Sequence, residues 1–291
     1  MTHRQFVPTP RYQAKVTRTL AQSETNHPSI KPTISRLTTP TTKKKATKDL
    51  DPDDIQIIPI EELLGATNTL GEQDIEHRKL YLYGEVNSNI CRELVEAILK
   101  INAIDEENEE EAQARVFEIS QLILETVDDE ETAKKIIAEY IEKATVPKRE
   151  PIFLFISSPG GSIEDGMPLV DAIRLSSTPI ITVNVGYWYS MALIIGMCGD
   201  CRISLPHSTF LLHDGAIQVE NTTGKIFDQF KFFNRLHENL KKLTLEQTDM
   251  TSEKYDEVIR SEFYMFAEGA KELGFIDAII GENEYPIEVI T

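Results

Sequence analysis

Apolar runs of four to six residues, separated by short polar stretches, recur along the chain from about residue 79 onward. Runs of this length with branched and aromatic side chains favour β-strands, and continuous ones are typical of strands buried on both faces of a sheet. Glycine-containing stretches over 84–87 and 157–161 interrupt the pattern and predict tight turns. The predicted strands span 79–83, 151–156, 180–185, 202–205 and 209–212.

Between these strands, apolar residues recur every three or four positions, which is the period of an amphipathic helix. One stripe follows the first strand, a second follows the turn at 157–161, and another helix is predicted to begin at Ser190. The alternation of strands and helices predicts a mostly parallel α/β core. The first two stripes consist of Ile90, Leu94, Val95, Ile98 and Ile101, and of Met167, Val170, Ile173 and Leu175.

Residues 104–148 form an acidic stretch with 14 Asp and Glu against five Lys and Arg. Apolar residues within it keep helical spacing, first around Val116 and Ile119 and then around Ile136 and Tyr140. The stretch therefore predicts two amphipathic helices rather than a loose acidic segment. We expect an inserted helical hairpin here.

A long helix is predicted over 226–243, where seven apolar positions follow one face. This apolar stripe is wide and includes Phe227, Phe230 and Phe233. Two interpretations stay open: the stripe packs on its own domain, or it is buried in an interface between subunits.

Charge is divided unevenly along the chain. Residues 1–49 carry ten Lys and Arg against two acids, a net of +8, whereas the remaining 20 basic and 46 acidic residues give 50–291 a net of −26. Many Thr, Ser and Pro residues predict that 1–50 is a disordered basic tail or a processed pro-segment. Its near lack of acids also resembles an organelle transit peptide, although scattered prolines interrupt the helix of such peptides. Residues 51–78 are then a linker or axial segment, and 79–291 form the folded domain.

Composition narrows the classes of function. An acidic body disfavours nucleic acid and anionic membranes as partners of the core. No apolar run approaches the ~20 residues of a membrane helix, and the N-terminus lacks the apolar stretch of a secretory signal. Three cysteines without an export signal favour a reducing compartment. A single Cys-x-x-Cys spacing is weak evidence for a metal site, so we interpret Cys198 and Cys201 as buried small residues. We expect no cofactor.

Ser190 and His213 are the candidate catalytic pair. Ser190 stands between an apolar strand and a predicted helix, where its hydroxyl lies near the positive end of the helix dipole and the Met191 N–H can stabilise an oxyanion. His213 ends a second strand and can take the serine proton, so the pair predicts a serine hydrolase. Structural roles compete, since serine often caps helices and lone histidines often lie in cores. The Gly-x-Ser-x-Gly elbow is missing because positions 188 and 192 are Trp and Ala, which disfavours an α/β-hydrolase.

Several short segments, in order and at family-like spacing, together resemble the proteolytic subunits of Clp proteases. The resemblance runs from about Leu80 to Ile280 and is interrupted by the acidic insertion. The segments that carry it are Tyr83–Asn87, Ser157–Gly161, Gly186–Met191, Arg202–Pro206 with Ser208, Leu212–His213 and Ala267–Asp277.

This resemblance implies a crotonase-like fold of repeated β-β-α units with a long handle helix. It also implies a serine endopeptidase in which Ser190 is the nucleophile and His213 is the base. The oxyanion donors fall on Gly161 and Met191. Rings of subunits, commonly two stacked heptamers, would enclose the sites and receive protein substrates from a partner AAA+ unfoldase, because the chain has no phosphate-binding loop of its own.

The chain departs from the family at the third catalytic position. Counting back from Gly274 and Asp277, Glu262 occupies the position at which the family has aspartate. A glutamate carboxylate can also hold a histidine in the required tautomer. Asp256 is the second candidate, and a Ser-His dyad without an acid is the third. The family usually has small residues at 187–189, and the bulky rings here either narrow the substrate groove or pack as core.

Two other functions remain possible from the sequence. One is a catalytically silent ring subunit, and the other is a crotonase-type enzyme acting on acyl-CoA thioesters. A membrane protease with a Ser-Lys dyad is disfavoured because no apolar anchor is present. We expect a cytoplasmic location, or an organelle matrix if residues 1–50 are a transit peptide.

Overall fold

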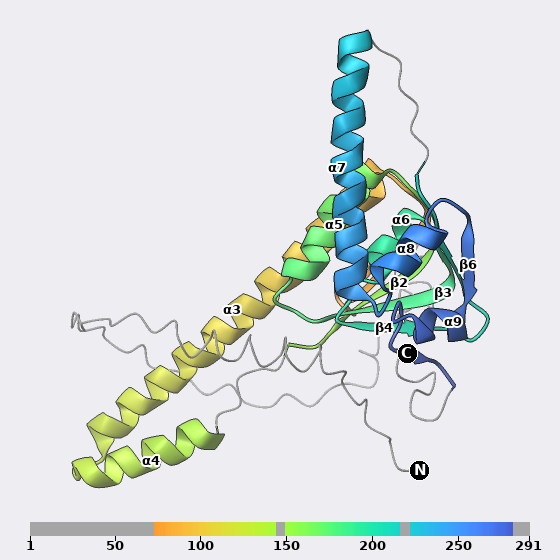
Figure 1. Cartoon of the computed structure of the whole chain (residues 1–291). Helices are drawn as coiled ribbons and strands as arrows, with labels where there is room; N and C mark the ends of the chain where they lie inside the picture. The colour runs from red at the N-terminus through yellow and green to blue at the C-terminus, as the bar shows by residue number, and fades with distance from the viewer. Residues whose placement is uncertain (1–72, 144–148, 216–221, 282–291) are drawn as a thin grey trace, which may run out of the picture.

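The computed structural model describes residues 73–143, 149–215 and 222–281, which form an α/β domain around a seven-stranded sheet (Figure 1). The predictions for residues 1–50 and for most of 51–78 lie outside this part. The strands are β1 (Lys79–Val86), β2 (Ile152–Gly161), β3 (Ile180–Tyr189), β4 (Cys201–Ser204), β5 (Thr209–Leu212), β6 (Phe263–Phe266) and β7 (Ala278–Ile279). The helices are α3 (Ser88–Thr126), α4 (Glu130–Lys143), α5 (Ile163–Leu175), α6 (Met191–Gly196), α7 (Thr223–Gln247), α8 (Ser252–Val258) and α9 (Ala267–Glu272).

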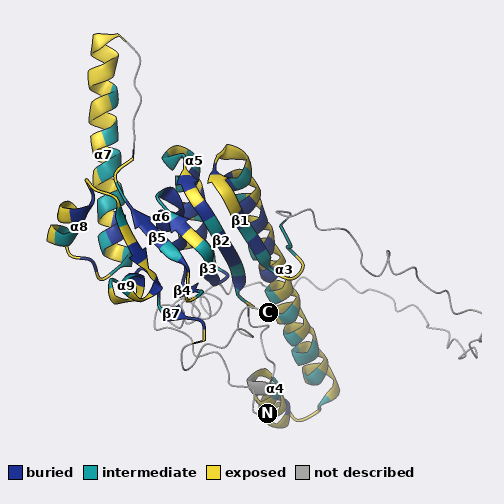
Figure 2. Ribbon diagram, turned by 90° about the vertical axis from the view of Figure 1, so that its right-hand side faces the viewer, coloured by how far each residue is buried: buried dark blue, intermediate teal, exposed yellow. Residues whose placement is uncertain are grey.

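The sheet confirms the predicted α/β class and its mainly parallel order. Strands β1, β2, β3, β4 and β7 lie side by side in that order, and each pair is parallel. Helices α3, α5 and α6 lie on one face of the sheet (Figure 2), and their buried side chains belong to the main apolar cluster. The other face carries a smaller cluster, made of Phe155, Ile181, Val183, Cys201, Ile203 and Ile280.

Strand β3 divides the sheet in two. Its residues 181–184 pair with β4, whereas 187–189 pair with β5. The buried Asn184 lies at this division, where its amide donates to the Thr209 carbonyl at 3.2 Å and accepts from the Gly186 N–H at 3.0 Å. Strand β5 and its antiparallel partner β6 are thereby held beside the end of β3, next to Ser190.

Two of the predicted turns are wrong. Residues 84–86 belong to β1, and 157–161 belong to β2. The parallel neighbours continue the hydrogen-bonded ladder past the glycines, and shifts of register at Tyr83/Glu85 absorb the irregular backbone. Gly84, at φ +80°, provides the conformation that this bulge requires.

The acidic stretch lies in two helices, as predicted, but the first of them does not begin within the stretch. Its first half continues the domain's own helix, so that α3 runs unbroken for 39 residues, and α4 then folds back on it. Asn87 starts α3 by accepting the N–H groups of Asn89 and Ile90 at 3.1 and 3.3 Å. No glycine or proline occurs between residues 85 and 146, so nothing in the sequence ends the helix where its buried face ends.

Helix α7 is covered by its own domain only toward its end. In Figure 2, exposed residues dominate the first half of α7. Ile226, Phe227 and Phe230 of the predicted stripe are exposed and Phe233 is half-buried, whereas Leu243 and Thr244 near the end of the helix are buried. The interpretation that the whole stripe packs on its own domain is therefore wrong for the first half of the helix. That half projects away from the sheet (Figure 1).

A buried ion pair joins β4 to the chain before β7. Arg202 donates from Nε and Nη2 to the Asp277 carboxylate at 3.0 and 2.7 Å. Its Nη1 donates to the carbonyls of Gln247 and Gly274 at 2.7 and 2.6 Å. One guanidinium thus fixes the ends of three segments that are distant in sequence.

Replacing Arg202 with methionine is expected to lower the free energy of unfolding by about 3–5 kcal/mol, because the remaining carboxylate and carbonyls lose their donor. Denaturant unfolding measures the change. The matched control is Arg174→Met, which breaks a pair with Glu246 in which both side chains are more than 40% exposed, and we expect a change below about 1 kcal/mol. Equal losses in the two variants would contradict this assignment.

Candidate active site

Ser190 occupies a sharp turn between β3 and α6. Its backbone has φ 53° and ψ −124°, a region that is costly for a residue with a side chain. Although it precedes the first residue of α6, its side chain makes no capping hydrogen bond. The N-cap alternative from the sequence is therefore wrong. The chain has the geometry of a strained nucleophile elbow without the glycines of the usual motif.

The glycine-rich end of β2 lies directly against this turn. A β-carbon on Gly160 would be 2.6 Å from the Tyr189 carbonyl oxygen, 2.7 Å from the Ser190 Cβ and 2.9 Å from the Met191 nitrogen. Gly160 has φ +89° and Gly161 has φ +148°. The absence of side chains thus allows two backbone segments to meet, and both predicted oxyanion donors belong to them.

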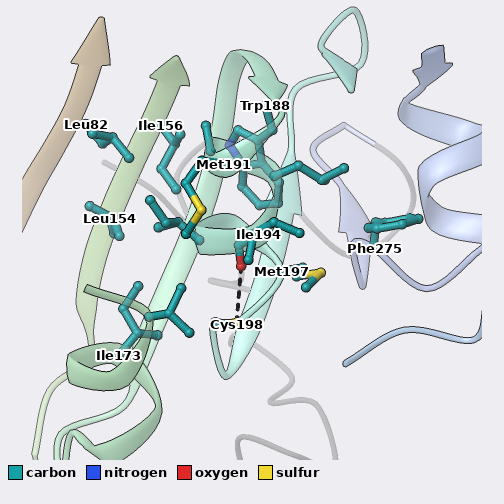
Figure 3. Packing of buried hydrophobic residues seen from close by; sticks show 14 of the residues in the cluster. Leu82, Leu154, Ile156, Ile173, Trp188, Met191, Ile194, Met197, Cys198 and Phe275 are labelled. Carbon is teal, nitrogen blue, oxygen red and sulfur yellow. Dashed lines mark hydrogen bonds between the residues drawn. The ribbon is translucent and has the colours of Figure 1, made fainter. Parts of the chain in front are cut away.

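Aromatic residues 187–189 divide between the two faces of β3. Trp188 is fully buried, packs edge-on against Phe210 at 5.5 Å and lies against Gly196 of α6. Figure 3 shows its ring within the same cluster as Met191 and Ile194. Tyr187 and Tyr189 lie on the opposite side, with ring centres 5.0 Å apart. Of the three aromatic rings, therefore, only that of Trp188 packs in the core as one interpretation of the sequence expected.

His213 follows β5 beside the serine turn. The Ser190 N–H donates to the Leu211 carbonyl at 2.9 Å, which fixes the two segments to each other. His213 is half-buried, two residues farther along. Within the residues described, no hydrogen bond joins its ring to Ser190 or to Glu262.

Glu262 lies one residue before β6, and the register relates it to His213. Strands β5 and β6 pair antiparallel from Thr209 opposite Phe266 to Leu212 opposite Phe263, and this register, extended by one step, would set His213 opposite Glu262. Opposite residues in such a pair share a face. The hydrogen-bonded ladder itself ends at Leu212 and Phe263, and the Asp214 N–H donates to the Ile259 carbonyl instead.

The exposed Glu262 carboxylate has a partner that the sequence did not suggest. The Tyr264 hydroxyl donates to Glu262 Oε2 at 2.8 Å, and this bond raises the pKa of Tyr264. The Tyr264 ring also packs edge-on against Tyr189 at 5.8 Å. The only signal in the sequence was the spacing of two, which puts residues 262 and 264 on one side of a strand.

Asp256, the second candidate for the acid, has another partner. It lies on α8, and both of its carboxylate oxygens accept from Lys241 Nζ at 2.6 Å. The Asp256 side chain is 61% exposed, whereas that of Lys241 is only 25% exposed. The charge of Asp256 is thus matched by a lysine.

Cys198 and Cys201 are buried in different apolar clusters. The Cys198 thiol donates to the Ile194 carbonyl at 3.2 Å (Figure 3), and burial raises the pKa of Cys201 to about 12. Among the described residues, no group of three His, Cys, Asp or Glu side chains is arranged to hold a metal. In the same part of the chain, no helix is long and apolar enough to span a membrane.

Burial of Cys201 predicts a loss of stability at alkaline pH. The unfolded thiol ionises near its ordinary pKa of 9, whereas the folded thiol stays protonated until about pH 12. Stability is therefore complete below pH 9 and falls as the pH rises toward 12, by about 1.4 kcal/mol at pH 10. Denaturant midpoints at pH 8 and 10 measure this fall. Cys201→Ala is expected to show a smaller fall than the wild type, and an identical fall would contradict the assignment.

Comparison with known proteins gives one consistent family. The model of the family described as Clp protease matches residues 105–283. The predicted extent of 80–280 thus agrees at its end, whereas β1 and the start of α3 lie outside the matched range.

Individual relatives carry the same name. The chain is 32% identical over 161 residues to the ATP-dependent Clp protease proteolytic subunit 2 of Corynebacterium efficiens. The aligned region covers 55% of this chain and 81% of the relative. Identity to the proteolytic subunit 2 of Tropheryma whipplei is 32% over 157 residues, with 53% and 87% covered. The proteolytic subunit of Deinococcus radiodurans is 26% identical over 172 residues, with 58% and 84% covered. With a family model that matches more than half of its length, the chain belongs to the Clp protease family.

Proposed function

We propose that this chain is a serine endopeptidase subunit with Ser190 as its nucleophile. The observation that carries the proposal is the strained, uncapped Ser190 turn packed against the Gly160 backbone in a member of the Clp protease family. A structural serine has no need of this conformation. Strain of this kind is held where a reactive group must be presented.

In the proposed reaction, Ser190 Oγ attacks the carbonyl carbon of a peptide bond while His213 takes its proton. The backbone N–H groups of Gly161 and Met191 stabilise the negative oxygen of the tetrahedral intermediate. His213 then protonates the leaving amine, and water activated by His213 hydrolyses the acyl-enzyme. Catalytic hydrogen bonds are often absent before substrate binds, which is consistent with the lack of a hydrogen bond between Ser190 and His213 among the described residues.

Glu262 is the acid that we assign to His213. The β5–β6 register, extended by one step, supports this choice, and the Tyr264 hydroxyl holds the glutamate carboxylate. Asp256 is disfavoured by its bonds to Lys241.

Replacing Glu262 with glutamine is expected to lower kcat for peptide hydrolysis by roughly 10²-fold, because the imidazole loses its orienting charge. The matched control is Asp256→Asn, for which we expect less than about a threefold change. Steady-state kinetics with a fluorogenic peptide measure both. A larger loss of kcat in the Asp256 variant would identify Asp256 as the acid of the triad. No loss in either variant would favour a Ser190–His213 dyad.

We further propose that the subunit works in a homo-oligomeric ring in the cytoplasm, fed with protein substrates by a separate AAA+ unfoldase. The exposed aromatic half of α7 offers an apolar surface for subunit contact. The names of the relatives describe ATP-dependent proteases, and this sequence has no phosphate-binding loop, so a partner must hydrolyse the ATP. An organelle matrix replaces the cytoplasm if residues 1–50 are a transit peptide.

Active-site labelling tests the proposed function. The purified full-length chain is treated with a fluorophosphonate, digested and mapped by mass spectrometry. We expect one adduct, on Ser190. Heat denaturation of the protein before labelling should prevent this adduct. Absence of this adduct, or an adduct on other serines alone, would overturn the hydrolase and leave the silent ring subunit as the better explanation.

A further inference from the structure

The part of α3 beyond Glu109 and the whole of α4 form an arm that projects from the domain (Figures 1 and 2). Helix α4 packs along α3 through the buried Ala133, yet large apolar side chains remain exposed on both helices. Phe117 is 66% exposed, Leu122 58% and Ile141 53%. Exposed apolar side chains at this density on a projecting pair of helices are typical of a contact surface.

Buried polar contacts fix the base of the arm. Arg149 donates from Nε and Nη2 to the Glu109 carboxylate at 2.6 and 2.7 Å, and the two side chains are only 10% and 14% exposed. One turn earlier, the buried Asp105 accepts from Arg78 at 2.9 Å and from the Thr178 hydroxyl at 2.5 Å. The arm is thus held in a defined direction and is preorganised to receive a partner.

The charge of the arm restricts the kind of partner. Residues 110–143, beyond the paired Glu109, include ten acidic and four basic residues, a net charge of −6. A partner must combine positive charge with apolar side chains in a short segment. Nucleic acids and anionic lipids are repelled.

Residues 11–20 of this chain have that composition and contain no proline. They contain Arg11, Lys15 and Arg18 and no acid. Their large apolar residues, Tyr12, Val16 and Leu20, recur every four positions, which is the spacing of one helical face. We propose that residues 11–20 dock on the acidic arm of the same chain, with their apolar face against its exposed apolar side chains and their cations among its carboxylates.

The length of the chain permits this contact. The 52 residues of 21–72 connect the segment to the domain and can extend to about 170 Å. The arm rises only about 32 Å over the 21 residues from Asp105 to Thr126, at 1.5 Å per residue. This contact lies apart from the proposed catalytic residues and does not depend on them.

Hydrogen exchange of the full-length protein, with and without charge reversal in the segment, tests the docking. In the variant Arg11→Glu/Lys15→Glu/Arg18→Glu, amides of α4 and distal α3 are expected to exchange about fivefold faster than in the wild type. Salt at 0.5 M should have the same effect on the wild type, because it screens the contact. The reciprocal variant Phe117→Ser should also speed exchange in α4.

The matched control reverses three other cations of the tail. Lys43→Glu/Lys44→Glu/Lys45→Glu changes the charge equally in a cluster without an apolar stripe, and we expect exchange in the arm to stay as in the wild type. An equal effect of the two triple variants would reduce the contact to unspecific attraction and overturn the proposal. Unchanged exchange in both would also overturn it, and protection that rises with protein concentration would identify a second copy as the occupant instead.

Discussion

Replacing Ser190 with alanine is expected to lower kcat for peptide hydrolysis by about 10⁴- to 10⁶-fold, because the acyl-enzyme can no longer form. The residual rate should come from binding and from the oxyanion donors alone. Hydrolysis of a fluorogenic peptide, followed over hours at high protein concentration, measures the loss. The variant should also fail to react with a fluorophosphonate.

The fold of this variant should be intact, which separates chemistry from structure. Since the Ser190 side chain makes no capping bond, its removal costs the helix no hydrogen bond, and we expect the free energy of unfolding to change by less than about 1 kcal/mol. Ser120→Ala is the control and should hydrolyse the peptide like the wild type, because the Ser120 hydroxyl lies in the distant arm, where it donates to the Val116 carbonyl of its own helix. Hydrolysis by the Ser190 variant within tenfold of the wild type would refute the nucleophile.

Much of the sheet was predictable because its strands are short, continuous apolar runs. Strand β5 has the predicted limits, and the runs at 151–156 and 180–185 are the starts of β2 and β3. Their ends were missed because glycine at a sequence position indicates a turn, whereas the parallel neighbours here carry the ladder past it. Pairing partners that are distant in sequence decide where a strand ends.

The candidate site was predictable in its residue types but not in its geometry. The pattern around Ser190 and His213 indicated a nucleophile and a base, yet no local signal indicated a non-glycine residue at φ 53°. Nor did the sequence suggest that Asn184 divides β3 between two partners, or that Tyr264 holds Glu262. These features depend on tertiary contacts, which sequence periodicity does not contain.

Replacing Gly160 with alanine is expected to lower kcat/KM by about 10³-fold or more, through displacement of the serine turn and its oxyanion donors. The new methyl group would meet the Tyr189 carbonyl oxygen, the Ser190 Cβ and the Met191 nitrogen at 2.6 to 2.9 Å. Two of these atoms belong to the backbone, so no side-chain rotation can make room. Kinetics with the same peptide measure the loss.

Gly84→Ala is the matched control for this variant, because both glycines have a positive φ and only their surroundings differ. Gly84 has φ +80° with no atom within 4 Å of an added β-carbon. It should therefore lose only about 1–2 kcal/mol of stability from the left-handed backbone and keep its activity within a few fold. If the Gly160 variant lost no more activity than the Gly84 variant, backbone strain alone would explain both results. A selective loss at Gly160 would instead show that hydrolysis depends on the close approach of the β2 glycines to Ser190.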